Sequence, residues 1–101
     1  MKNTKYWKQQ QEKTQFIVDS RVFPALLAER FLEDNTVIIV IDSGAPKVFE
    51  YINGVYKYRS ELEVKAALGE YIKRYNRELW RSIALPLDIN YLIWYNQLIR
   101  S

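Results

Sequence analysis

Six basic side chains in the middle of the chain are the residues best suited to binding a ligand. Their chemistry would be phosphate binding, because Lys and Arg neutralise a nucleic-acid backbone and release its condensed counterions. Three of them, Lys73, Arg77 and Arg81, recur every four residues and would form one stripe on a continuous helix. The candidate nucleic-acid-binding residues are Lys57, Arg59, Lys73, Arg74, Arg77 and Arg81.

The same charges also have a purely structural interpretation. Glu70 and Glu78 lie four residues on either side of Arg74, and pairs at this spacing often keep a surface helix soluble. The formal net charge of +3, from 15 basic and 12 acidic side chains, is compatible with nucleic acid without indicating it. Both interpretations stay open at this point.

A run of aromatic residues surrounds Asn53-Gly54, the dipeptide most typical of a two-residue hairpin turn. Side chains alternate along strands, so one face of this hairpin would carry four rings: Phe49, Tyr51, Tyr56 and Tyr58. Exposed rings can stack on nucleobases, whereas buried rings form a core. Glu50 and Lys57 would pair on the opposite face and need water there, so we expect the rings to pack on helices.

Catalysis has few candidate groups. The sequence contains no His and no Cys, which removes the commonest general base and the thiol nucleophile. Asp42-Ser43-Gly44 therefore reads as a turn, and Glu29, Glu33 and Asp34 as a solvated helix face. No phosphate-binding loop or metal-ligand spacing is present. We predict a chain that is not an enzyme and needs no metal or cofactor.

The elements that would position the basic residues follow from local signals. Pro24 suits the first turn of a helix that ends near Asn35. Ser60 and Glu63 form a capping box at the start of a second helix. That helix either continues to about residue 84 or breaks near Gly69 or Asn76, and a last helix follows Pro86.

These signals predict an α+β domain in which a small three-stranded antiparallel meander packs against three or four helices. The expected strands span about 36–41, 47–52 and 55–58, joined by a loop at 42–47 and the Asn-Gly turn. Residues 36–41 are apolar almost throughout, so we expect that strand to be covered on both faces. Residues 16–101 would form a single domain, preceded by a flexible or docking basic arm at 1–15.

The apolar runs are too short to span a bilayer, and no signal-peptide pattern follows Met1. We expect a cytoplasmic protein without a membrane partner.

Residues 27–72 resemble the module that precedes the helicase in phage, plasmid and poxvirus-type primase–helicases. The hairpin Phe49–Tyr56 matches the family's "YxYxNGVY"-like element, and residues 61–72 match its "ELEVKxxLGEYI" helix. The resemblance implies a non-catalytic accessory domain of a mobile-element DNA replication protein. Such a module links or positions a primase and a superfamily 3 ATPase on DNA.

Two functions therefore remain. The first is this accessory domain, with DNA and the helicase or primase domains of the same or another chain as partners. The alternative is a small phage-type protein–protein interaction or oligomerisation module without DNA binding, suggested by the surplus of aromatic residues and by the apolar strand at 36–41.

Overall fold

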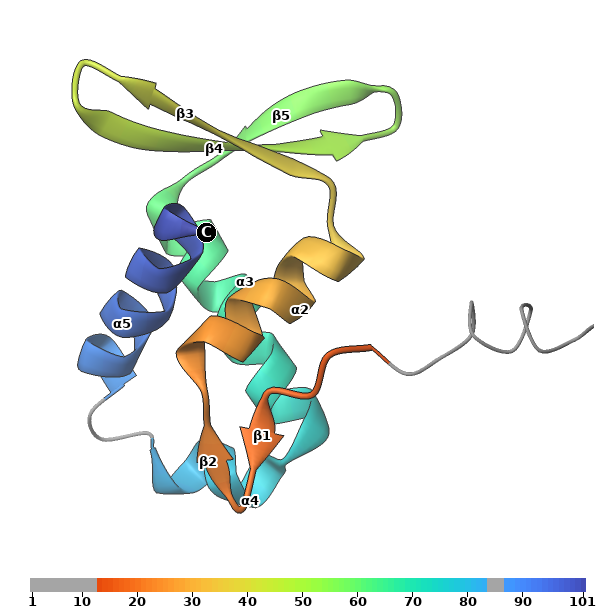
Figure 1. The fold of residues 1–101 in the computed structure, drawn as a ribbon, viewed down its shortest axis with the longest axis vertical. Helices are drawn as coiled ribbons and strands as arrows, with labels where there is room; N and C mark the ends of the chain where they lie inside the picture. Colours follow the sequence, from red (N-terminus) through yellow and green to blue (C-terminus); the bar gives the residue numbers. More distant parts are fainter. Residues whose placement is uncertain (1–12, 84–86) are drawn as a thin grey trace, which may run out of the picture.

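A three-stranded antiparallel sheet lies across one end of a group of helices, and a short two-stranded ribbon lies at the other end (Figure 1). The structure is a computed structural model and describes residues 13–83 and 87–101. This arrangement confirms the predicted α+β class and the three-stranded meander packed against several helices. Residues 1–12 of the predicted flexible or docking arm at 1–15 lie outside the described residues.

The ribbon pairs β1 (Ile17–Val18) with β2 (Arg21–Val22) and leads directly into α2 (Pro24–Asp34). Asp19 and Ser20 form its turn with φ values of 51° and 61°. Short polar residues tolerate this left-handed conformation better than most, which is why the turn forms here. This ribbon was not predicted from the sequence, whereas the helix at α2 was, with Pro24 in its first turn.

The meander consists of β3 (Val37–Asp42), β4 (Ala45–Ile52) and β5 (Val55–Arg59), in that order across the sheet. Asn53 and Gly54 connect β4 to β5 with φ values of 51° and 88°, as a type I′ turn requires. Ser43 and Gly44 make a second turn of this kind, with φ values of 54° and 82°. The predicted loop at 42–47 is therefore shorter, and β4 begins at Ala45.

Pro46 is accommodated inside β4 by the register of the first hairpin. Asp42 and Ala45 flank the two-residue turn, so Ile41 and Pro46 form the next pair, in which the backbone groups point away from the partner strand. The position where Pro46 would carry an N–H faces the β5 side of β4. Because β5 pairs only with Val48–Ile52, no strand needs a hydrogen bond there.

Three helices complete the chain: α3 (Glu61–Tyr75), α4 (Arg77–Ser82) and α5 (Leu87–Arg100). The capping box at α3 is confirmed, because the Ser60 hydroxyl accepts from the Glu63 N–H and the Glu63 carboxylate accepts from the Ser60 N–H. α3 ends at Asn76, whose side-chain oxygen accepts from the Leu79 N–H and begins α4. Of the alternatives left open by the sequence, the break near Asn76 is the one observed.

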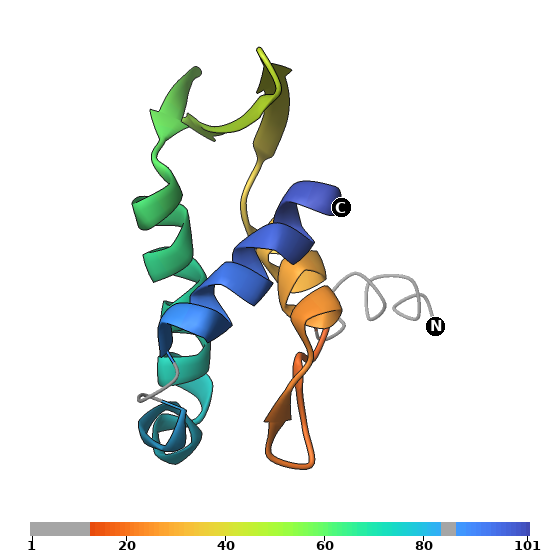
Figure 2. The same ribbon diagram turned by 90° about the vertical axis from the view of Figure 1, so that its left-hand side faces the viewer.

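The core lies where α5 packs against both α2 and α3, beneath the sheet (Figure 2). Its buried residues come from every layer: Phe16, Leu27, Ala28, Phe31, Val48, Val64, Leu68, Tyr71, Ile72, Trp94, Tyr95 and Leu98. Gly69 permits this packing, since a Cβ there would lie 2.9 Å from a ring carbon of Tyr91 and 3.2 Å from Trp80. Trp94 and Tyr95 contribute two large rings to this core, at 3% and 6% exposure.

The aromatic face of the hairpin is exposed, and the prediction that it packs on the helices is wrong. Val48, only 2% exposed, faces the helices, and strand alternation turns Tyr51, Tyr56 and Tyr58 away, at 47%, 47% and 57% exposure. The physical reason is Glu50, which lies on the Val48 side. Its carboxylate accepts a hydrogen bond from Arg59, so the charged side of the hairpin packs inward as a satisfied ion pair.

The prediction that 36–41 is covered on both faces is also wrong within this chain. β3 is an edge strand, and Ile38 and Val40, which lie on the same face as the tyrosines, are 43% and 41% exposed. The alternating residues of the same strand, Val37 and Ile39, lie on the inner face and pack against the core.

None of the helices described in the structure is long and apolar enough to cross a membrane.

Candidate functional site

The six candidate basic residues fall into two groups at opposite ends of α3 (Figure 1). Lys57 and Arg59 belong to β5, immediately before the first turn of α3. The other four, Lys73, Arg74, Arg77 and Arg81, lie in the last turn of α3 and in α4. Because α3 has 15 residues, about 22 Å of helix separates the two groups. The structure therefore does not bring the six together.

The four residues at the α3–α4 junction, hereafter the junction cations, are largely solvent-exposed; only Lys73 is half-buried. Arg77 and Arg81 remain four residues apart within α4, but the break at Asn76 removes them from the axis that carries Lys73. The single continuous stripe predicted for an unbroken helix is thus replaced by a cluster that bends around the junction.

None of the junction cations forms an ion pair with a side chain in 13–83 or 89–101. In particular, neither Glu70 nor Glu78 lies within ion-pair distance of Arg74, so the pairs expected at a spacing of four residues are not formed. Arg74 instead lies against an aromatic ring, with its guanidinium carbon 5.9 Å from the centre of the Tyr71 ring.

Other cations of the chain are held by acids. Lys13 lies 2.5 Å from Asp34, Lys65 lies 2.6 Å from Glu61, and Lys47 lies 3.2 Å from Asp42. Arg59 is ion-paired with Glu50 and lies 3.6 Å from Glu63. The junction cations consequently differ from these residues in having their charge available to an external anion.

Lys57 is exposed and has no ion pair within the described part of the chain. It lies directly opposite Glu50 in the β4–β5 register, as predicted. Glu50 nevertheless pairs with Arg59 instead. As a result, Lys57 remains available at the β5 edge of the sheet, between Tyr56 and Tyr58 in sequence.

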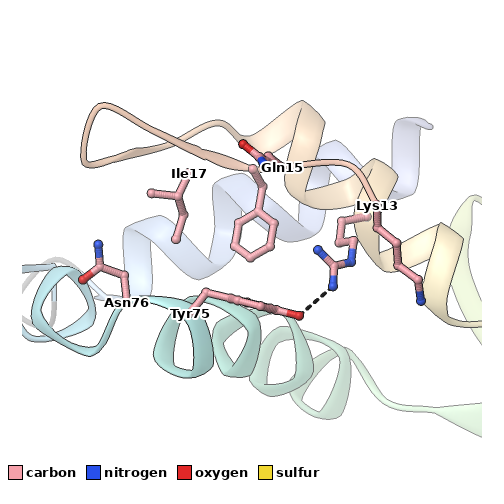
Figure 3. A pocket seen from close by; sticks show the side chains of 7 residues that line it. Lys13, Gln15, Ile17, Tyr75 and Asn76 are labelled. Carbon is pink, nitrogen blue, oxygen red and sulfur yellow. Dashed lines mark hydrogen bonds between the residues drawn. The ribbon is translucent and has the colours of Figure 1, made fainter. Parts of the chain in front are cut away.

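A cavity of about 480 Å³ opens between the segment that precedes β1 and the end of α3 (Figure 3). It is lined by Lys13, Gln15, Phe16, Ile17, Arg30, Tyr75 and Asn76. The Phe16 ring meets Tyr75 edge-on, with centroids 5.7 Å apart. Arg30 donates to Asp34, to the Thr14 carbonyl and to the Tyr75 hydroxyl, at 3.0, 3.3 and 2.7 Å. These contacts join the guanidinium of Arg30 to α2, α3 and the N-terminal segment, so this cation of the cavity stabilises the fold and is not available to a ligand.

Asp34 is the centre of this contact network. It accepts from Lys13, Arg30 and the Tyr71 hydroxyl, which joins the N-terminal segment to α2 and α3. Partial burial alone would raise the pKa of Asp34, but these three hydrogen bonds outweigh it and hold the pKa below its usual value. The prediction that Asp34 belongs to a solvated face is therefore wrong, although its spacing from Arg30 offered a signal.

Glu33 also holds the N-terminal segment, since its carboxylate accepts from the Thr14 hydroxyl and backbone N–H, and these bonds lower its pKa. Within the described residues, no group of three or more His, Cys, Asp or Glu is placed to hold a metal ion. Glu33 and Asp34 thus serve as acceptors for the N-terminal segment, Arg30 and Tyr71, and the chemistry that the junction cations support best is the binding of an anion.

Comparison of the chain with known protein families, with curated protein sequences and with solved structures gave no significant match.

Proposed function

We propose that this chain is a non-catalytic accessory domain of a mobile-element DNA replication primase–helicase, and that it holds DNA through the junction cations. The domain works in the cytoplasm, beside primase and helicase domains of the same or another chain. In this role it positions the replication protein on its template and leaves the chemistry to those domains.

The observation that carries this proposal is the difference between the junction cations and the ion-paired cations of the chain. Lys73, Arg74, Arg77 and Arg81 gather within nine residues, and no described acid neutralises them. A cluster of this kind matches the spaced negative charges of a phosphate backbone. The resemblance of residues 27–72 to the pre-helicase module adds support from the sequence.

Fluorescence anisotropy with a labelled DNA duplex at low salt tests the proposal. Wild-type protein should bind, and its affinity should fall steeply as salt is added. Arg77→Glu with Arg81→Glu should weaken binding at least about tenfold and reduce the salt dependence by roughly two phosphate contacts. Arg21→Glu with Arg100→Glu, which makes the same charge change on exposed residues of β2 and α5, is the matched control.

Duplex affinity that is unchanged in the double variant would remove the junction cations from the proposal. Absence of any DNA binding by the wild-type protein, together with a mass that rises with concentration in sedimentation, would instead favour the alternative of an oligomerisation module.

A further inference from the structure

We propose that the outer face of the sheet binds the unpaired bases of a single nucleic-acid strand. This inference rests on the proposed function, since it assumes that the chain contacts DNA. It goes further by naming a second contact surface and by specifying the form of the nucleic acid.

The outer face is defined by the strand register. It carries six apolar or aromatic side chains from all three strands: Ile38, Val40, Phe49, Tyr51, Tyr56 and Tyr58. No described helix covers it, because the helices lie on the opposite side of the sheet, against Val48 (Figures 1 and 2). An exposed patch of this kind on a small domain indicates an interaction surface.

The rings on this face are arranged in two pairs across β4 and β5. Tyr51 and Tyr56 have centroids 5.0 Å apart with their planes at 62°, and Phe49 and Tyr58 lie 5.8 Å apart at 66°. Each ring supports its partner, which restricts the side-chain rotamers before any ligand arrives. A platform of preset rings binds flat groups with less loss of conformational entropy than mobile rings would.

The backbone under the rings is also fixed. The two-residue turn at Asn53-Gly54 sets the β4–β5 register, and the buried Val48 anchors β4 to the core. The Glu50–Arg59 ion pair and its contact with Glu63 tie β5 to the start of α3. The tyrosines therefore occupy defined positions relative to the rest of the domain.

Charge decides which ligand fits. Glu50, the acid nearest to the rings along β4, points to the inner face and is neutralised by Arg59, and Asp42 on β3 is paired with Lys47. Lys57, which has no described ion pair, starts on the inner face of the edge strand β5, so a chain that lies on the rings meets it by passing around the β5 edge of the sheet. The rings thus lie on a face where no described acid of the sheet is left unpaired, and this suits a single strand with its bases on the rings and its backbone passing around the β5 edge to Lys57.

The test compares three ligands by anisotropy at low salt: a labelled oligothymidine strand, an abasic strand of equal length and a duplex. Tyr56→Ala with Tyr58→Ala should weaken binding of the oligothymidine about 30-fold, as expected for the loss of two stacked bases. Binding of the abasic strand and of the duplex should stay unchanged. Tyr56→Phe with Tyr58→Phe keeps both rings and is the matched control, with affinity close to that of the wild type. Both substituted positions are exposed, and the far-ultraviolet circular dichroism of each variant verifies its fold.

The failures of the two proposals can be told apart. If the Ala variant binds oligothymidine as tightly as the wild type, or if the abasic strand binds equally well, the inference is overturned while duplex binding through the junction cations stands. If the Ala variant abolishes a concentration-dependent mass in sedimentation and leaves strand affinity unchanged, the face is a protein interface and the inference is likewise overturned. If no form of DNA binds, both proposals fail.

Discussion

At the scale of the residue, the ion pair that Glu50 forms determines which face of the three-stranded sheet is buried. Glu50 could pair with Lys57, directly opposite, or with Arg59, one step along the same face. Arg59 is the last residue of β5, and its side chain also contacts Glu63 in the first turn of α3. The ion pair with Arg59 therefore brings Glu50 towards the helices. The ion pair then replaces water at the inner face, and the tyrosines take the outer one.

The network around Asp34 makes stability dependent on pH. The pKa of Asp34 is lower in the folded chain than in the unfolded chain, so its contribution is complete above the ordinary value of about 4 and is lost as the pH falls through the lowered one. Asp34→Asn should reduce the free energy of unfolding by about 2 kcal/mol at neutral pH. Its stability should also fall less on acidification than that of the wild type. Urea unfolding between about pH 7 and pH 2 measures both effects.

Glu70→Gln is the control for this prediction, because Glu70 is exposed and has no ion pair with the described side chains. It should follow the wild-type pH profile closely. A profile for Asp34→Asn that runs parallel to the wild type, shifted by a constant amount, would contradict the assigned role of the carboxylate.

At the scale of the element, Asn76 separates α3 from α4 and so decides how the junction cations are presented. Asn76→Ala removes the acceptor for the Leu79 N–H and should lower the free energy of unfolding by about 1 kcal/mol. It also favours a continuous helix, in which Arg77 and Arg81 would align with Lys73. Duplex affinity should therefore change in Asn76→Ala, measured by anisotropy beside urea unfolding.

Asn76→Ser retains a good N-terminal cap without adding charge, and it should keep both the stability and the affinity of the wild type. If Asn76→Ala lowers stability but leaves duplex affinity as it was, the bend contributes to the fold alone.

The elements that the sequence predicted correctly are those specified by neighbouring residues. The Asn53-Gly54 turn, the Ser60 and Glu63 capping box and Pro24 in the first turn of α2 each act within a few positions of the chain. The exposure of the hairpin rings could not be predicted in this way. It depends on an ion pair between two strands and on which face meets α3, and the alternation of side chains is the same for either choice.

The candidate site was predictable in its residue types but not in its arrangement. The sequence indicated a basic surface, yet the separation into two groups depends on the length of α3 and on the break at Asn76. The β1–β2 ribbon escaped prediction because two-residue strands produce no detectable alternation. Asp19 and Ser20 between Ile17-Val18 and Arg21-Val22 were the available signal.

At the scale of the whole molecule, α3, which is about 22 Å long, lies between the junction cations and the sheet, and the outer face is on the far side of that sheet. A stacked strand advances about 3.4 Å per nucleotide, so at least about seven nucleotides are needed to reach from the junction cations to the rings of the outer face. Once a strand is long enough, the second contact becomes intramolecular and gains from a high effective concentration. The affinity for a single strand should therefore rise abruptly once the strand is long enough to reach both surfaces.

A series of oligothymidines from about 4 to about 16 nucleotides, titrated by anisotropy, measures the step. Tyr56→Ala with Tyr58→Ala and Arg77→Glu with Arg81→Glu should each remove it, because each leaves one contact surface. A smooth increase with length in the wild-type protein would show that the two surfaces do not share a strand.

The position of Pro46 has a consequence for how the domain behaves at high concentration. Where β5 stops short of the full length of β4, the backbone of residues 45–47 lies beside open solvent, and a strand from another molecule would find a place to pair edge to edge. Pro46 has no backbone N–H to donate to such a strand, so the hydrogen bonding between the two strands is interrupted there. The fold thus leaves its tyrosines uncovered while protecting this end of β4 from the pairing that leads to fibrils.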